Sequence, residues 1–327
     1  MILPVESVPS NHSVVMILAT TPFLADSITT NDPVNPNNFH EQLKVIILVP
    51  VTILIILSNL VVLFYIMCHK QLHKPTYLFV ASLGIADLFV GCVCIGSIVH
   101  PNDPVLELCL VRMGFVISAC VASLYCMTWI AIDRYIAIIY PLRYPQKMTV
   151  KRACFIIVCI WTGCFLIGFA PLTGWNVGVY HQYCSFSYIM SPTYLVFLFV
   201  SGFVLPMLVI IIVYWRLFEK ARVHFKRILA IETVIAQNEH ADQRSYHTGH
   251  SHRNWKSVRI LMVLIGCFTI TWCPFMVTAF TQAICGDDTC HLKDIIGSYL
   301  LLLGFSNSFL NPIIYAVSNQ EFQTDVL

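Results

Sequence analysis

Long runs of uncharged, mostly apolar residues recur seven times along the 327-residue chain. They lie at approximately 45–68, 75–99, 106–133, 152–172, 192–215, 257–283 and 295–317. A helix needs about 20 apolar residues to cross the membrane, whereas a barrel strand needs only about ten. In lipid every backbone amide must find a partner within the protein, so runs of this length favour helices. The pattern therefore predicts an all-α membrane protein, a seven-transmembrane helix bundle.

The composition agrees with this pattern, because 57% of the residues are hydrophobic and only 11% are charged. A soluble domain usually carries about 25% charged residues. The net charge of +2 gives no indication of a nucleic-acid partner. We expect an N-terminal segment at 1–43, the helix bundle at 44–317 with a flexible connection at about 217–255, and a tail at 318–327.

Basic residues indicate the orientation of the bundle, because Lys and Arg favour the cytoplasmic side. Most of them lie in the connections after the first, third and fifth runs, whereas the opposite connections are mainly acidic. The N-terminus is therefore expected outside and the C-terminus inside. Residues 1–43 lack the pattern of a removable signal peptide. They contain a glycosylation sequon at Asn11, which this orientation places outside.

Four cysteines belong to the outer side in this topology: Cys109, Cys184, Cys285 and Cys290. Four cysteines allow three pairings. Closing the short segment between Cys285 and Cys290 costs little chain entropy, so we pair these two and join Cys109 with Cys184.

Asp87 lies near the middle of the second run, where a charge costs on the order of 3 kcal/mol to insert. Polar side chains stand at a similar depth in other runs: Ser123, Asn307, Ser308 and Asn311. A carboxylate among hydroxyls and amides suits a hard cation such as sodium, which prefers oxygen ligands. The alternative is a hydrogen-bond network between helices. No other cofactor is expected.

Asp133, Arg134 and Tyr135 follow the third run. Arg134 is 25 residues after Cys109, which corresponds to about 37 Å along one helix. Because Cys109 marks the outer mouth, Arg134 belongs to the inner surface. It is either an anchor at the interface or a switch, an arginine that a neighbouring acid holds in one state and releases toward a partner in another.

Eight motifs, in order along the seven runs, resemble those of the rhodopsin-like (class A) G-protein-coupled receptors. The residues that carry the resemblance are Asn59, Asp87, Cys109, Arg134 of "DRY", Trp161, Pro206 with Tyr214, Phe268, Trp272 and Pro274 of "FTITWCP", and Asn311, Pro312 and Tyr315 of "NPIIY". The match covers about 45–322. It implies a multi-pass protein of the plasma membrane that binds a heterotrimeric G protein.

The resemblance also implies roles for these positions. The G-protein switch would consist of Asp133, Arg134, Tyr135, Leu142, Tyr214 and Tyr315. Leu142 would insert into the G protein, whereas Tyr214 and Tyr315 would hold Arg134 in the active state. The family's sodium pocket would consist of Asp87, Ser123, Asn307, Ser308 and Asn311, called the Asp87 group here. Phe268 and Trp272 would transmit ligand contact. Asn254 replaces an acid that often clamps the arginine, so ligand-free signalling is expected, and 318–327 would begin an eighth helix.

For each of three ligand classes, the chain lacks the residue that a receptor for that class requires. An amine receptor would need an acid 18 residues before Arg134, where Val116 stands. An opsin would need a lysine at the position of Phe305, and an adenosine receptor an amide at that of Ala279. A different small-molecule receptor of the same family stays open as the alternative.

The outer half of the runs supplies an apolar set with one cation: Arg112, Val116, Ile117, Cys120, Phe186, Phe197, Trp272, Phe275, Phe280, Leu302 and Phe305. Such a cleft suits a long-chain lipid with a polar or phosphate head. The alternatives are that the aromatic residues pack between helices or face lipid, and that Arg112 is an interfacial anchor. Stretches such as "CLVRMGFVISA" and "YCSFSYIMSP" resemble family members that respond to fatty-acid ethanolamides and lysophospholipids, which implies stimulatory G-protein coupling and cyclic AMP.

An enzyme or a transporter is the competing interpretation. An enzyme would need a nucleophile and a base at one depth, and the middle of the runs contains no histidine. A transporter usually shows repeated halves with broken helices, and no internal repeat is found. We therefore expect a receptor rather than an enzyme.

Overall fold

The computed structural model describes residues 36–99, 103–178, 180, 184–237, 244–286 and 289–318. For part of the helical residues, including 36–45, 223–261 and 315–318, it describes the backbone alone. The predicted glycosylation at Asn11 and most of the predicted tail lie outside the described residues. Residues from Ile47 onward form one unit, which is the unit considered below.

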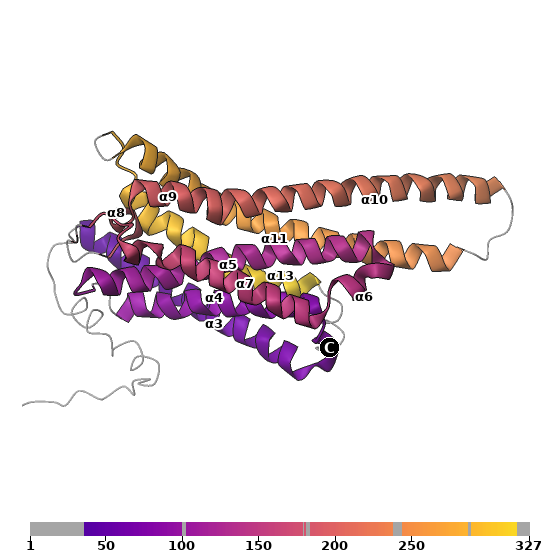
Figure 1. The fold of residues 1–327 in the computed structure, drawn as a ribbon, viewed down its shortest axis with the longest axis horizontal. Helices are drawn as coiled ribbons and strands as arrows, with labels where there is room; N and C mark the ends of the chain where they lie inside the picture. The colour runs from indigo at the N-terminus through magenta and orange to yellow at the C-terminus, as the bar shows by residue number, and fades with distance from the viewer. Residues whose placement is uncertain are drawn as a thin grey trace, which may run out of the picture. The chain divides into compact units, whose positions relative to one another are not determined.

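Helices occupy all seven of the predicted runs and lie along one common direction (Figure 1). Their bounds are α3 (Pro36–Cys68), α4 (Pro75–Val99), α5 (Leu106–Ile139), α7 (Val150–Phe169), α9 (Pro192–Phe199) continuing into α10 (Leu205–Gln237), α11 (Arg244–Cys285) and α13 (Leu301–Ser318). Among the described residues, six segments are long and apolar enough to cross a membrane, and Leu301–Ile314 adds a shorter apolar helix. The predicted all-α membrane fold is confirmed, whereas which end faces outside stays a prediction.

Short elements connect these helices. They are the 3-10 turns η1 (Lys70–Leu72), η2 (Pro141–Arg143) and η3 (Ala170–Thr173), the short helices α6 (Tyr144–Lys147), α8 (Phe186–Ile189) and α12 (Lys293–Ile295), and the π-helical turns η4 (Val200–Val204) and η5 (Ile296–Leu300). One isolated β-bridge pairs Asn176 with Met190.

Local sequence explains several helix ends. Pro75 and Pro192 begin α4 and α9, where proline's missing N–H has no intrahelical partner to lose. The Ser191 hydroxyl caps α9 by accepting the Tyr194 N–H at 3.3 Å. At its C-terminus, α5 ends at Ile139, because Pro141 disfavours a helical conformation at Tyr140, the residue before it.

Four helices extend beyond their predicted limits. Helix α3 begins at Pro36, inside the N-terminal segment expected at 1–43. The third run was expected to end at Asp133, but α5 continues to Ile139, because a charge ends an apolar run without ending the hydrogen-bonding pattern of a helix. Likewise α10 reaches Gln237 and α11 begins at Arg244, inside the connection predicted at about 217–255. Residues 217–237 contain no proline or glycine and many strong helix formers, which favours this extension.

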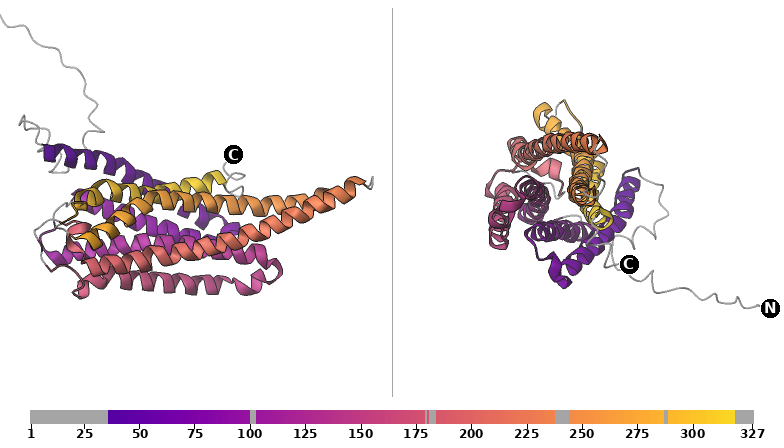
Figure 2. Two further views of the ribbon diagram at one scale, coloured as in Figure 1. Left: turned by 90° about the horizontal axis from the view of Figure 1, so that it is seen from above. Right: turned by 90° about the vertical axis from the view of Figure 1, so that its right-hand side faces the viewer.

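Helix α5 lies at the centre of the bundle and contacts α4, α7, α10 and α11. Seen end-on, the helices lie side by side around a common direction (Figure 2). Large side chains are fully buried between them, including Phe79, Leu83, Leu124, Ile210 and Leu264. Lipid tails are as apolar as these side chains, so close van der Waals packing rather than the hydrophobic effect holds the helices together here. This packing fixes the positions of polar residues on α5.

Helices α5 and α7 lie close together at Gly114 and Gly168. A Cβ atom added to Gly168 would lie 2.5 Å from the Gly114 carbonyl oxygen and 2.9 Å from the Ser118 amide nitrogen. Both neighbours are backbone atoms, which cannot move aside cheaply. The absence of a side chain at Gly168 therefore sets the distance between the two helices.

We expect Gly168→Ala to lower the thermal unfolding midpoint of the purified protein by about 5 °C, since overpacking usually costs about 1–3 kcal/mol. Thermal unfolding in detergent measures this change. Gly163→Ala on the same helix is the matched control, because a Cβ there meets no atom within 4 Å. Equal midpoints for the two variants would contradict this account of the contact.

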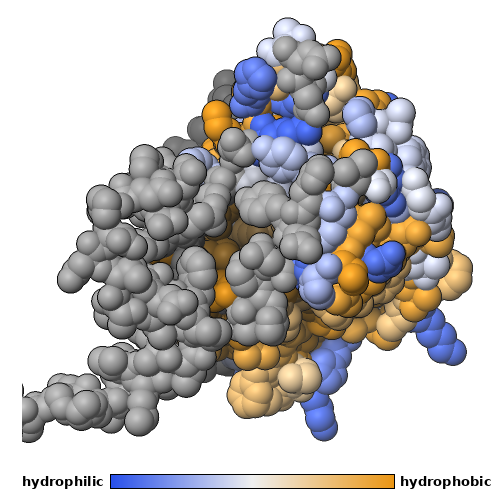
Figure 3. Space-filling view, turned by 90° about the vertical axis from the view of Figure 1, so that its left-hand side faces the viewer, coloured by the Kyte–Doolittle hydropathy of each residue, from blue (hydrophilic) through white to orange (hydrophobic). Residues whose placement is uncertain are grey.

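The two ends of the bundle differ in chemistry. One, called the disulfide end here, carries Cys109, Cys184, Cys285 and Cys290, and the other, the Arg134 end, carries Asp133 and Arg134. Figure 3 shows the disulfide end, where hydrophilic side chains lie among hydrophobic ones. These two ends hold different candidate sites.

Candidate functional site

Asp133 and Arg134 form an ion pair at the Arg134 end of α5. The Arg134 guanidinium donates to Asp133 Oδ2 from Nη2 at 2.7 Å and from Nε at 3.2 Å. Asp133 is fully buried, whereas the Arg134 side chain is 28% exposed. The arginine therefore lies at the boundary between a buried acid and the surface, as the switch interpretation requires.

Thr76 and Tyr144 hold the same carboxylate from two other elements. The Thr76 hydroxyl at the start of α4 donates to Asp133 Oδ2 at 2.6 Å and accepts from Arg134 Nη2. The Tyr144 hydroxyl of α6 donates to Asp133 Oδ1 at 2.8 Å. Burial raises the pKa of Tyr144, so its hydroxyl stays a donor at neutral pH. Sequence reasoning assigned neither residue a role, although Tyr144 ends the stretch "DRYIAIIYPLRY".

The other predicted switch residues are not joined to this network by any hydrogen bond among the described residues. Tyr135 is half-buried, and Leu142 is 92% exposed in η2. The Tyr214 hydroxyl is buried and has no hydrogen-bond partner among the described residues. The side chains of Tyr315 and Asn254 lie outside the described residues. Leu142 therefore presents an almost fully exposed apolar side chain at this end.

Asp87 lies buried in α4 among the polar residues predicted to surround it. The Asn311 amide of α13 donates to Asp87 Oδ2 at 2.9 Å, and all of the surrounding side chains are buried: Ser123, Asn307, Ser308 and Asn311. Several buried oxygens have no hydrogen-bond partner among the described residues: Asp87 Oδ1, Ser123 Oγ, Asn307 Oδ1 and Asn311 Oδ1. Unsatisfied buried oxygens around one acid fit the chemistry of a small hard cation.

Asn59 connects this region to α3. Its amide donates to the Ile55 carbonyl and to the Ser308 carbonyl, both at 2.9 Å. Because Ser308 belongs to α13, the amide holds α13 against α3 beside the Asp87 group. The polar centre is therefore built from residues of four helices, α3, α4, α5 and α13.

An aromatic column runs from the disulfide end toward the middle of the bundle. Its members are Phe186, Phe275, Trp272 and Phe305, which come from α8, α11 and α13 and are all buried. Ring centroids are 5.4 Å apart for Phe186 and Phe275, 5.6 Å for Phe275 and Trp272, and 6.4 Å for Trp272 and Phe305. Phe268 continues the column at 6.2 Å from Trp272. These separations are typical of interacting aromatic pairs.

Gly304 allows Trp272 to lie against α13, because a Cβ there would be 3.0 Å from the indole ring. Sequence reasoning did not identify this residue. Its only signal is a glycine within an apolar helical run, which does not say what approaches it. The position of the Trp272 ring thus depends on a residue without a side chain.

The remaining residues of the predicted cleft divide into two groups. Val116, Ile117 and Cys120 lie on α5 and pack into the core. Phe197 is 37% exposed, and its ring packs on Trp175 at 5.1 Å rather than on the aromatic column. Phe280 stacks on Phe199 at 4.5 Å. The structure therefore brings together most of the predicted set but places Phe197 on an outer surface.

Arg112, the single cation of the predicted cleft, forms an ion pair with Asp103. Its Nη2 atom is 2.7 Å from Asp103 Oδ2, and both side chains are largely buried. Sequence reasoning did not identify Asp103 as the partner of Arg112. This charge is therefore already balanced within the protein.

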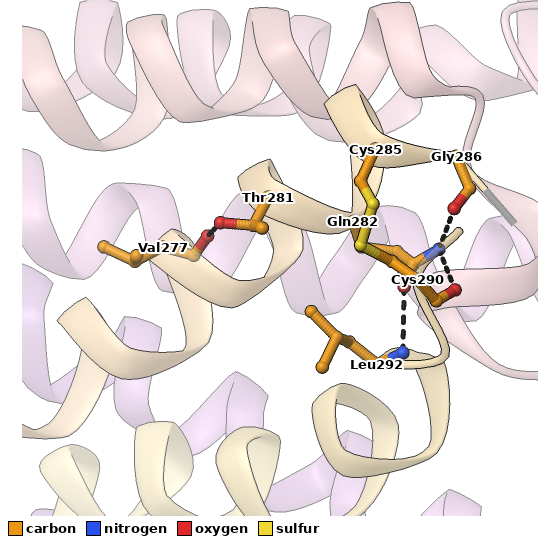
Figure 4. The surroundings of a disulfide bond; sticks show 7 residues. All are labelled: Val277, Thr281, Gln282, Cys285, Gly286, Cys290 and Leu292. Carbon is orange, nitrogen blue, oxygen red and sulfur yellow. Dashed lines mark hydrogen bonds between the residues drawn. A yellow bond between two sulfur atoms is a disulfide. The ribbon is translucent and has the colours of Figure 1, made fainter.

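Two disulfides fix the segments around this end. Cys109 is joined to Cys184, and Cys285 to Cys290, which are the pairs that the cysteine positions predicted. Figure 4 shows the second disulfide beside Gln282, whose side chain accepts the Leu292 N–H at 2.9 Å and donates to the Cys290 carbonyl at 3.2 Å. The connection between α11 and α12 is therefore tied back to α11.

Comparison with known proteins agrees with these features. Residues 58–315 match the family model described as 7 transmembrane receptor (rhodopsin family). The Glucose-dependent insulinotropic receptor of Homo sapiens is 33% identical over 287 residues, covering 84% of this chain and 83% of that receptor. The rat receptor of the same name, from Rattus norvegicus, is 34% identical over 284 residues, which cover 84% and 59%. The Alpha-1A adrenergic receptor of Oryzias latipes is 27% identical over 299 residues, which cover 62% of that receptor. The chain thus spans about three fifths of the length of the rat receptor and of this adrenergic receptor (59% and 62%).

Proposed function

The chain belongs to the rhodopsin family of seven-transmembrane receptors, and we propose that it senses a lipid such as a fatty-acid ethanolamide or a lysophospholipid. As a member of this family it is a multi-pass receptor of the plasma membrane that responds to a small molecule and acts on a heterotrimeric G protein. We further propose that its partner is the stimulatory G protein, so that activation raises cyclic AMP.

The aromatic column is the observation that carries the lipid proposal. Four buried rings extend from the disulfide end to the middle of the bundle, and Val116 and Ile117 of α5 contribute further apolar side chains. Ligand sites are usually apolar with a few placed polar groups, and an acyl chain needs such a surface. The adrenergic relatives raise an amine as the alternative, but the position that would hold the acid partner of an ammonium is Val116.

The Arg134 end supports the G-protein proposal. We place this end in the cytoplasm and the N-terminus outside, because the basic connections gather there. The receptor then exchanges between two states, and ligand binding favours the state in which Arg134 leaves Asp133 and faces the G protein. Leu142, almost fully exposed in η2, supplies an apolar contact for that partner.

The Asp87 group is proposed as an allosteric sodium site. Asp87, Ser123, Asn307, Ser308 and Asn311 would hold the ion through oxygen atoms. A bound cation would balance the buried carboxylate and stabilise the resting arrangement of the helices around it. Agonist and sodium would therefore favour different states.

We expect sodium to weaken agonist binding to the wild-type receptor several-fold and to have no effect on Asp87→Asn, whose amide lacks the charge that attracts the ion. Agonist competition binding in sodium chloride and in potassium chloride of equal concentration measures this difference. Potassium controls for ionic strength. The same salt response in both proteins would remove the sodium proposal.

Cyclic AMP in cells that express this chain tests the proposed function. We expect a raised level without ligand and a further rise with oleoylethanolamide or lysophosphatidylcholine, whereas noradrenaline serves as the amine comparison and should have no effect. Surface expression is measured in parallel. No response to either lipid at normal surface expression would reject the ligand class, and an unchanged baseline as well would reject stimulatory coupling.

A further inference from the structure

Asp103 is held in place at the disulfide end from several sides. Its carboxylate pairs with Arg112 at 2.7 Å, and its backbone carbonyl accepts the Tyr180 hydroxyl at 2.7 Å. Its carboxylate oxygen also lies within 4.8 Å of the sulfur atoms of Cys109 and Cys184. The acid is therefore a fixed part of this end of the bundle.

The pair is also poorly hydrated. The side chains of Arg112 and Asp103 are only 13% and 12% exposed. Removing one member of such a pair leaves a charge that water cannot solvate well, which is strongly unfavourable. The ion pair therefore resists any ligand that would have to break it.

Arg112 lies about one helical turn from Val116 along α5, on the side of the disulfide end. Residues four apart on a helix share one face, so Arg112, Val116 and Cys120 follow each other along α5. Val116 and Cys120 pack against the buried core. A lipid chain that contacts Val116 would bring its head group to the Arg112 and Asp103 pair.

We infer that the Arg112–Asp103 ion pair makes this receptor select lipids with uncharged head groups over anionic lipids of the same chain. The inference rests on the proposed lipid-sensing function and narrows its ligand class. The carboxylate of an anionic fatty acid would compete with Asp103 for Arg112 and leave Asp103 without its cation. An ethanolamide has no charge, and its amide and hydroxyl can hydrogen-bond to the pair without separating it.

Two ligands with the same acyl chain test the selection: oleoylethanolamide, which is neutral, and oleate, which is an anion at neutral pH. In wild-type cells we expect the cyclic AMP response to oleate to need at least about tenfold more lipid, equivalent to 1.4 kcal/mol. Asp103→Asn keeps the size of the side chain but removes the competing charge. We expect it to raise the potency of oleate relative to oleoylethanolamide about tenfold, so that the two half-maximal concentrations become similar.

The control is the double variant Arg112→Gln with Asp103→Asn, in which the gain for oleate should vanish because the cation is absent. If Asp103→Asn fails to reach the cell surface, Asp103→Ser replaces it. The potencies of the two lipids on the wild-type receptor test the selection without any variant. Equal wild-type potency of the two lipids, or an equal change of both in Asp103→Asn, would overturn the inference alone. No wild-type response to either lipid would overturn the proposed lipid-sensing function, and the inference with it.

Discussion

Replacement of Arg134 by alanine is expected to abolish G-protein activation while leaving ligand binding nearly unchanged. Arg134 is partly exposed at its end of α5, whereas Val116, in the proposed ligand site, is 18 residues away. That separation corresponds to about 27 Å along the helix, so loss of the guanidinium should not reach the aromatic column. We expect agonist-stimulated cyclic AMP to fall to the level of cells without receptor, with binding affinity within about threefold of wild type.

Arg134→Lys is the matched control, because it keeps the charge but loses the planar group that donates to Asp133 Oδ2 from two nitrogens. A partial response is expected from it. If Arg134→Ala reduced ligand binding as much as signalling, the residue would be a structural anchor rather than a switch.

The second large effect is expected from Asp133→Asn, which should raise ligand-free signalling about tenfold. The asparagine has nearly the same shape and can still accept from Tyr144, but it no longer attracts the guanidinium of Arg134. A hydrogen bond to a charged group usually contributes about 1.5–3 kcal/mol, and 1.4 kcal/mol corresponds to a factor of ten. Cyclic AMP without ligand, normalised to surface expression, measures the change.

Tyr144→Phe separates the charge of Asp133 from the number of its hydrogen bonds. It removes the 2.8 Å hydrogen bond to Oδ1 and leaves the ion pair intact. We expect less than about a threefold change in ligand-free signalling. An increase as large as that of Asp133→Asn would show that the packing of α6, rather than the ion pair, controls Arg134.

The helices and disulfides could be predicted because local patterns determine them. Apolar runs of about 20 residues specify spans, and the short distance between Cys285 and Cys290 favours their pairing. The limits of α5 and α10 were less certain, because helical hydrogen bonds continue past the first charged residue. What the apolar pattern marks is the extent of the hydrocarbon region rather than that of the helix.

The partners of the key charges could not be predicted in the same way. Thr76 meets Asp133 across 57 positions of the chain, and only the packing of α4 against α5 brings them together. Asp103 precedes α5, and only the three-dimensional arrangement of the residues around the start of that helix brings it to Arg112. Phe197 resembles the other aromatic residues in sequence, yet the rotation of α9 turns it toward Trp175. These contacts depend on tertiary structure, which a single sequence does not specify.

Nucleotide exchange on purified stimulatory G protein, with the receptor reconstituted in lipid nanodiscs, tests the central claim most directly. Wild-type receptor with oleoylethanolamide should accelerate exchange above the ligand-free rate, and Arg134→Ala at equal concentration and equal thermal stability should give no acceleration. No acceleration by a folded wild-type receptor, or the same acceleration by Arg134→Ala, would contradict the account of a lipid-sensing receptor that acts through this arginine.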